Sequence, residues 1–131
     1  HVVAPVAGGT ETILLVEDDE TLRHITFKML SLRGFLVLEA RNGREAISVC
    51  DQNGGRIDLI LSDLIMPELG GLEAWRIIHE RYPAIKVLFM SGYISDESKR
   101  TAMERLGVSC LMKPFDPRRM LTAVRKELDR G

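Results

Sequence analysis

Five short apolar runs, separated by longer stretches with helical periodicity, constrain the fold of this chain most strongly. Each run is rich in Val, Ile, Leu or Phe and is too short to be a buried helix. Runs of this kind are typical of strands in a parallel sheet that is covered on both faces. Strict alternation of strand and helix, with right-handed crossovers, predicts an open parallel α/β sheet with helices on both faces. The runs are Ile13–Val16, Phe35–Leu38, Ile57–Leu61, Ile85–Met90 and Val108–Met112.

Amphipathic patterns fill the intervals between the apolar runs. The first helix should bury Leu22, Ile25, Met29 and Leu32, which share one helical face. The segment Ser95–Leu106 is mostly polar, so we expect it to form the least firmly packed helix. The remaining helical patterns lie around Ala46–Cys50, Leu72–Ile78 and Pro117–Asp129.

Length and charge limit the organisation further. A chain of 131 residues fits one compact domain. Residues 1–10 lack periodicity and predict a linker or tail, which leaves residues 11–131 for the domain. With 18 basic and 19 acidic side chains the net charge is close to zero, so the chain as a whole does not attract nucleic acid or an anionic membrane surface electrostatically. Two cysteines without metal-ligand spacing predict free thiols in a cytoplasmic protein.

Polar side chains follow four of the predicted strands. Glu17 and Asp18 come after the first, Asp63 after the third, Ser91 after the fourth and Lys113 after the fifth. A lone acidic residue at such a place is usually a solvated turn or a charge at a helix start. In an open parallel sheet, however, the carboxyl ends of the strands form the ligand-binding edge. We therefore expect these five side chains to converge there.

Converging carboxylates need compensation. Two of them about 5 Å apart repel by about 3 kcal/mol at an effective dielectric constant near 20, which is large against a domain stability of about 5–15 kcal/mol. A raised pKa or a bound cation relieves such repulsion, and Mg²⁺ suits carboxylate oxygens with room for water. An Asp carboxylate is also a nucleophile toward phosphorus. Asp63 is the natural candidate, with Ser91 and Lys113 available to contact phosphoryl oxygens.

Other phosphate-binding folds fit less well. No GxxxxGK[ST] segment is present, which excludes a P-loop, and no GxGxxG segment follows a predicted strand. A flavin phosphate would meet the carboxylates after the first strand and be repelled. A phosphoryl group bridged by Mg²⁺ is different, because the metal neutralises both sides.

Several motifs in order resemble the receiver domain of two-component response regulators, and the resemblance spans residues 12–129. It implies a flavodoxin-like fold of five βα units with strand order 2-1-3-4-5. The motifs are ILLVEDD at 13–19, LILSDLIMP at 59–67, GLE at 71–73, MSG at 90–92 and LMKPF at 111–115.

The resemblance also implies roles for individual residues. Asp63 would accept a phosphoryl group from the phosphohistidine of a histidine kinase or a histidine phosphotransfer protein. Ser91 would be the switch hydroxyl and Lys113 the lysine that contacts the phosphoryl group, with a cis bond between Lys113 and Pro114. The Mg²⁺ ligands would be Glu17, Asp18, Asp63 and the backbone carbonyl of Ile65.

Four positions depart from the usual pattern of this family. Cys110 stands where an aromatic switch residue is common, and Gly70 stands where many members have Asp. Ile65 is apolar two residues after Asp63, and Tyr93 is bulky two residues after Ser91. Together Ile65 and Tyr93 lead to the hypothesis that water attacks the phosphorylated form slowly.

The setting of the domain suggests its parent protein. The segment GGTETILLVE at 8–17 resembles the entry into the C-terminal receiver of a hybrid sensor histidine kinase, and the sequence ends after the last helix without a DNA-binding domain. We expect such a receiver or a single-domain regulator, and not a free-standing enzyme. One alternative is a pseudo-receiver that binds partners without phosphorylation. The other is a phosphatase of the haloacid dehalogenase type, which usually needs a second acid where Ile65 stands.

Overall fold

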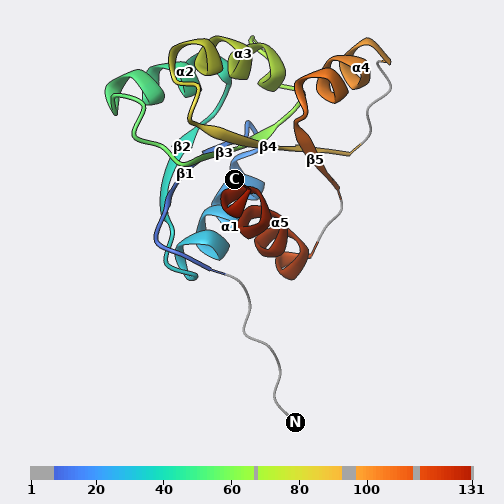
Figure 1. Cartoon of the computed structure of the whole chain (residues 1–131). Coiled ribbons are helices and arrows are strands. Elements are labelled where there is room, and N and C mark those ends of the chain that lie inside the picture. The colour runs from blue at the N-terminus through green and yellow to red at the C-terminus, as the bar shows by residue number, and fades with distance from the viewer. Residues whose placement is uncertain (1–7, 67, 93–96, 114–115, 131) are drawn as a thin grey trace.

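The computed structural model contains a parallel sheet flanked by helices (Figure 1), and it describes residues 8–66, 68–92, 97–113 and 116–130. The strands are β1 (Thr12–Val16), β2 (Leu36–Ala40), β3 (Leu59–Asp63), β4 (Lys86–Ser91) and β5 (Ser109–Met112). The helices are α1 (Glu20–Ser31), α2 (Gly43–Gln52), α3 (Gly71–Arg81), α4 (Glu97–Leu106) and α5 (Pro117–Asp129). In these described residues we find no helix with the length and apolar character to cross a bilayer.

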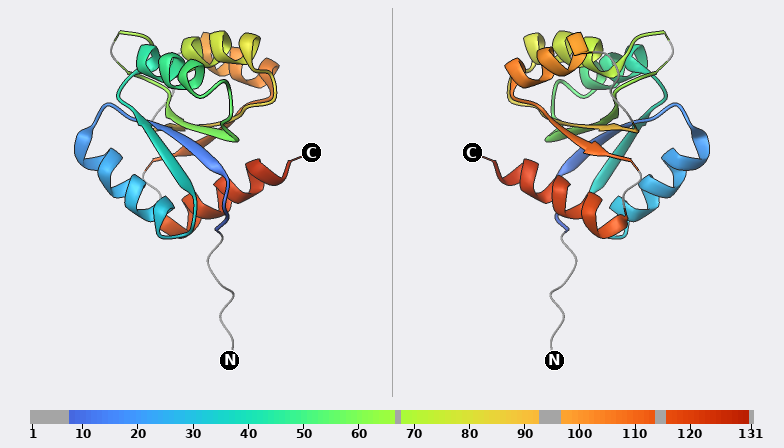
Figure 2. Two further views of the ribbon diagram at one scale, coloured as in Figure 1. Left: turned by 90° about the vertical axis from the view of Figure 1, so that its left-hand side faces the viewer. Right: turned by 90° about the vertical axis from the view of Figure 1, so that its right-hand side faces the viewer.

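The sheet has the order β2-β1-β3-β4-β5, and every neighbouring pair is parallel. Helices α2, α3 and α4 cover one face, while α1 and α5 cover the other (Figures 1 and 2). The predicted fold class and strand order are therefore confirmed: the chain is a flavodoxin-like α/β domain. The order reverses between β1 and β3, so this switch point lies in the middle of the sheet.

Two apolar cores form because the strands are apolar on both faces. Along β1, Leu14 and Val16 point to the α2–α3–α4 side, and Ile13 and Leu15 to the α1–α5 side. This alternation follows from the period of two in a strand. The two cores hold both faces of the central strands rigidly, which fixes the positions of the residues at their ends.

The buried face of α1 differs from the one predicted. Ile25 and Leu32 are 49% and 84% exposed, whereas Thr26 and Leu30 are buried. The hydroxyl of Thr26 donates a hydrogen bond to the carbonyl of Leu22 at 2.9 Å, so this polar side chain is satisfied inside the core. Hydropathy alone misassigned the face because it counts threonine as a surface residue.

Edge position explains a second difference. The run at Phe35–Leu38 was predicted to be covered on both faces, but β2 lies at the edge of the sheet and Leu36 is 60% exposed.

The strands β3 and β4 extend one or more residues past the carboxyl ends of their predicted apolar runs. Asp63 pairs with Met90 in the register, so it is the last residue of its strand and not the first of a loop. Backbone pairing continues through polar residues, whereas an apolar pattern stops before them.

The first described residues of the chain contact the last helix, α5. Arg125 of α5 donates one hydrogen bond to the carbonyl of Gly8 at 3.0 Å and forms an ion pair with Glu11. The amide of Gly9 donates to the carbonyl of Arg33 at 3.1 Å. Residues 8–10 of the predicted tail thus contact the domain, and residues 1–7 are not among those described.

Candidate functional site

The carboxyl ends of the central strands bring three carboxylates together. Val16 pairs with Ser62 in the β1–β3 register, so Glu17 and Asp63 follow side by side. One carboxylate oxygen from each of Glu17, Asp18 and Asp63 can be chosen so that all three lie within 4.8 Å of one another. This spacing fits a single cation with oxygen ligands. The predicted convergence of these three residues is therefore seen in the structure.

Lys113 reaches the same cluster from the end of β5. Its ammonium nitrogen lies 3.3 Å from Oε1 of Glu17 and 3.4 Å from Oδ2 of Asp63. The backbone amide of Lys113 donates to the carbonyl of Ser91 at 2.8 Å, which extends the β4–β5 pairing and fixes where the lysine stem starts. The lysine bridges two carboxylates from two different strands.

Burial dominates the electrostatics of the cluster. Glu17 is 1% exposed, and desolvation raises its pKa to about 7; the negative charge of Asp63 adds to this, while the amide of Asp19 and the charge of Lys113 oppose it. Burial also lowers the pKa of Lys113, but the charges of Asp63 and Glu17 outweigh it and the net shift is upward. One ammonium against three carboxylates leaves the site short of positive charge. The residues present therefore fit a divalent cation such as Mg²⁺.

The turn after β1 is held by contacts that the sequence did not reveal. Nη1 of Arg23 donates to the carbonyl of Glu17 at 2.9 Å, and Nε of Arg23 lies 3.3 Å from Glu39. Asp19 caps α1 by accepting from the amide of Leu22 at 3.0 Å, and its own amide donates to Oε2 of Glu17 at 3.2 Å. The sequence signal for this role of Arg23 is weak: a basic residue in the first turn of the helix that follows the acidic run at 17–20.

Gly71 belongs to the GLE motif at 71–73, but its packing role at the end of β3 was not predicted from the sequence. A Cβ atom at this position would overlap the carbonyl oxygen of Asp63 and crowd the hydroxyl of Ser62. The amide of Gly71 donates to the carbonyl of Leu64 at 3.0 Å, so the first residue of α3 packs directly on the end of β3. Only glycine permits this approach. The adjacent pair Gly70-Gly71 was the available signal.

The remaining predicted residues lie at the same edge. Ser91 is 3% exposed and follows Met90, the register partner of Asp63. Ile65 lies two residues after Asp63 and is 58% exposed. The predicted Mg²⁺ contact of the Ile65 carbonyl stays a prediction, as do the expected switch role of Ser91 and the role of Lys113 toward a phosphoryl group. Tyr93 and Pro114, and with them the cis bond, lie outside the described residues.

Cys110 occupies the position where the family resemblance predicts an aromatic residue. It pairs with Phe89 in the β4–β5 register and packs partly buried against the core on the α2–α3–α4 side. Burial raises the pKa of its thiol, as it does for Cys50, whose pKa rises to about 11. Both cysteines are free thiols, as predicted.

Comparison with known proteins finds one matching family and relatives that share it. The sequence profile of the family described as response regulator receiver domain matches residues 13–125. The sensor kinase CckA of Brucella abortus (strain 2308) is 35% identical over 123 residues, which are 94% of this chain and 13% of that kinase. The chain therefore spans about one eighth of this relative's length.

Solved structures agree with the sequence relatives. The receiver domain from the hybrid histidine kinase CckA is 33% identical with a TM-score of 0.70, over 90% of this chain and 99% of that chain. A CheY-like receiver domain protein from Methanospirillum hungatei JF-1 is 25% identical with a TM-score of 0.84, over 92% of this chain and 95% of that chain.

Proposed function

Because the chain belongs to the response regulator receiver domain family of two-component systems, we propose that Asp63 is its phosphoacceptor. The observation that carries this proposal is the geometry at the sheet edge. Carboxylate oxygens of Glu17, Asp18 and Asp63 fall within 4.8 Å of one another, and the ammonium of Lys113 lies 3.4 Å from Asp63. This combination offers a nucleophile, a cation site and a fixed positive charge in one place.

Glu17, Asp18, Asp63 and the backbone carbonyl of Ile65 would hold Mg²⁺. When bound, Mg²⁺ supplies positive charge to phosphoryl oxygens and lowers the repulsion between the incoming phosphate and the carboxylates. The desolvated carboxyl of Glu17, with its pKa raised to about 7, is stabilised in its ionised form by a cation. Glu17 is buried and Asp18 is exposed, so the proposed Mg²⁺ site would have one enclosed and one accessible carboxylate ligand.

In the transfer step, a carboxylate oxygen of Asp63 attacks the phosphorus of a phosphohistidine. The new O–P bond forms as the P–N bond breaks, and the bonding electron pair stays on the imidazole nitrogen of the donor. The ammonium of Lys113 is already within 3.4 Å of Asp63, so it can stabilise the charge that develops on a phosphoryl oxygen. The Ser91 hydroxyl would donate a hydrogen bond to another oxygen.

The signal would arise from these same contacts. A phosphoryl group shifts an equilibrium only if it contacts one conformation better than the other. Ser91 ends β4 and Lys113 follows β5, so their contacts with the phosphoryl group would bias the segments that follow both strands.

Receiver domains in two-component systems receive phosphoryl groups from histidine kinases. For this chain we propose a histidine kinase or a histidine phosphotransfer protein as the donor. Its similarity to the receiver of a hybrid kinase supports such a kinase as the parent protein.

The test is phosphorylation by a small acyl phosphate in Mg²⁺ buffer, followed by intact-mass measurement. We expect the mass of one added phosphoryl group, lost without Mg²⁺ and lost in Asp63→Asn. Asp129→Asn, at the far end of α5, is the matched control and should be phosphorylated normally. A folded protein that gains no phosphoryl group would instead act as a pseudo-receiver, and steady phosphate release from unrelated monoesters would identify a phosphatase.

A further inference from the structure

A groove separates α3 from α4 on the face of the sheet that these helices share. Its volume is about 580 Å³, which falls within the range of small-molecule sites of roughly 300–1,000 Å³. The groove exists because α4 packs loosely: Met103 is the one fully buried residue among its described side chains. Its lining residues are Arg76, Glu97, Ser98, Thr101, Ala102, Arg105 and Leu106.

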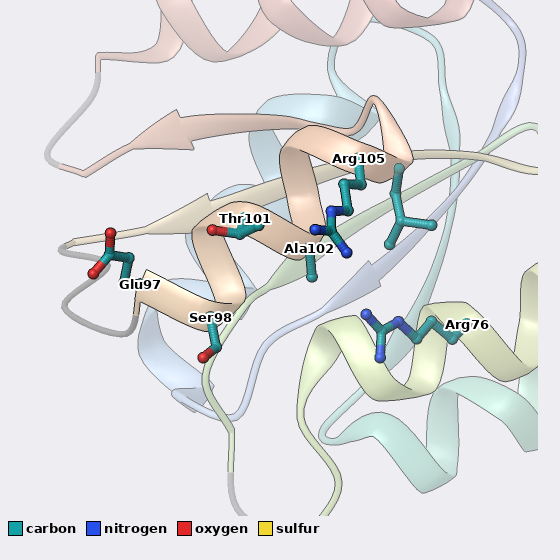
Figure 3. Close-up of a pocket in the computed structure, with 7 residues that line it drawn as sticks. Arg76, Glu97, Ser98, Thr101, Ala102 and Arg105 are labelled. Atoms are coloured by element: carbon teal, nitrogen blue, oxygen red, sulfur yellow. The ribbon is translucent and has the colours of Figure 1, made fainter.

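Two arginines from different helices enter this groove. Figure 3 shows Arg76 of α3 and Arg105 of α4 directing their guanidinium groups into the space between the helices. In the part of the chain that the structure describes, neither guanidinium has an ion pair or a hydrogen bond. A pair of like charges that line one groove repel each other, and an anion between them reverses the sign of that interaction.

The neighbouring ion pair makes the contrast clear. Near the start of both helices, Lys99 of α4 and Glu73 of α3 lie 4.0 Å apart and connect them. Farther along, where Arg76 and Arg105 line the groove, no carboxylate among the described residues plays this part. Glu97 lines the groove in the first turn of α4, away from the two guanidiniums (Figure 3). The positive charge of the groove is therefore concentrated at one end.

We propose that the α3–α4 groove binds the phosphate end of a small phosphorylated molecule between Arg76 and Arg105. Guanidinium groups bind phosphate oxygens through paired, charge-assisted hydrogen bonds, and two of them match a phosphoester or pyrophosphate. Thr101 lies on the same groove wall, with its hydroxyl toward the Glu97 end (Figure 3). Ala102 and the 40%-exposed Leu106 add apolar surface for the rest of the molecule.

This site is separate from the carboxylate cluster in residues and in charge. The cluster at Asp63 attracts cations, and without Mg²⁺ it repels phosphate, whereas the groove attracts phosphate directly. Binding in a metal-free buffer therefore does not involve the carboxylate cluster, whether or not Asp63 accepts a phosphoryl group, and the arginine variants assign it to the groove.

The experiment is a titration of isotope-labelled protein in metal-free buffer at constant ionic strength, followed by amide NMR signals. The probes are inorganic pyrophosphate and adenosine diphosphate. We expect saturable shifts concentrated on residues 76 and 98–106. Arg76→Gln and Arg105→Gln should each weaken binding about tenfold, as expected for the loss of one charge-assisted contact. Arg100→Gln is the matched control on the same helix and should change affinity by less than about twofold.

The comparison between probes defines the ligand. Equal affinity for both probes means that the groove binds only the phosphate groups. Tighter binding of adenosine diphosphate means that the groove also contacts the nucleoside. Either result supports the site. Shifts that do not saturate, or that chloride reproduces at the same ionic strength, would overturn it. Wild-type affinity in both folded arginine variants would overturn it as well.

Discussion

The ammonium nitrogen of Lys113 lies 3.4 Å from Oδ2 of Asp63, although fifty residues separate them in the sequence. The same nitrogen lies 3.3 Å from Glu17, so one lysine stabilises two carboxylates that would otherwise face each other in a partly desolvated site. The side chains of Lys113, Asp63 and Glu17 are 24%, 14% and 2% exposed. The lysine therefore contributes to the stability of the metal-free fold as well as to the proposed chemistry.

Replacing this lysine should destabilise the metal-free domain. Lys113→Met leaves Glu17 and Asp63 without their cation, and we expect the free energy of unfolding at neutral pH to fall by about 1–3 kcal/mol. Urea unfolding followed by the fluorescence of Trp75, the only tryptophan, measures this change. Saturating Mg²⁺ should restore much of the loss, because it supplies positive charge to the same carboxylates.

Lys99→Met provides the comparison. Lys99 lies 4.0 Å from Glu73, whose side chain is 46% exposed, so its loss should cost less than about 1 kcal/mol. Equal losses in the two variants would mean that the carboxylate cluster gains no special stability from Lys113.

The buried carboxyl of Glu17 predicts a pH dependence. Its pKa in the fold is about 7, above the ordinary value of 4.5, so the fold favours the protonated form. This contribution to stability is fully present below pH 4.5 and is lost as the pH rises through 7. In metal-free buffer we expect the free energy of unfolding to fall between about pH 5 and pH 8, by on the order of 1–3 kcal/mol from this group.

Glu17→Gln tests the assignment of this pH dependence. The variant keeps the shape of the side chain but cannot ionise, so its stability should change less over the same pH window. Saturating Mg²⁺ should also flatten the wild-type profile, because a metal binds the ionised carboxylate. A variant with the wild-type slope would place the pH dependence in other groups.

The sequence predicted the members of the carboxylate cluster because each stands at the carboxyl end of a strand in a parallel sheet. Glu17, Asp63 and Lys113 needed only the strand count and the rule that the carboxyl ends meet. Arg23 and Gly71 could not be predicted in this way. Arg23 acts through a backbone carbonyl, and Gly71 acts by lacking a side chain where α3 meets β3, so both depend on interatomic distances that no residue pattern records.

The same limit appears in the packing. The continuous apolar run at Ile13–Val16 correctly predicted a strand that is covered on both faces. The face of α1 was assigned wrongly, since Thr26 is buried with its hydroxyl bonded to its own helix and Ile25 is half exposed. Helix orientation depends on the shape of the surface underneath, and a one-dimensional pattern does not contain that shape.

Gly71 should tolerate no side chain. In Gly71→Ala the new methyl group overlaps the carbonyl of Asp63, so the start of α3 or the end of β3 must move. We expect a loss of about 1–3 kcal/mol in the free energy of unfolding and weaker Mg²⁺ binding, because the position of Asp63 changes. Gly92→Ala is the control, since its Cβ would meet no atom of the described residues within 4 Å. Unchanged stability and metal affinity in Gly71→Ala would show that the contact relaxes without cost.

Ile65 should set the lifetime of the phosphorylated form. It lies two residues after Asp63 and is 58% exposed, so it offers an apolar side chain beside the acceptor and no group that could orient water. We expect Ile65→Asn, whose amide can position a water molecule for attack on phosphorus, to shorten the phosphoryl half-life by about tenfold or more. Ile65→Leu should leave it within about twofold, because the side chain stays apolar. The measurement is the decay of phosphorylated protein by intact mass after the acyl phosphate is removed. A wild-type half-life of seconds in Mg²⁺ buffer, or equal decay in Ile65→Asn, would contradict this role.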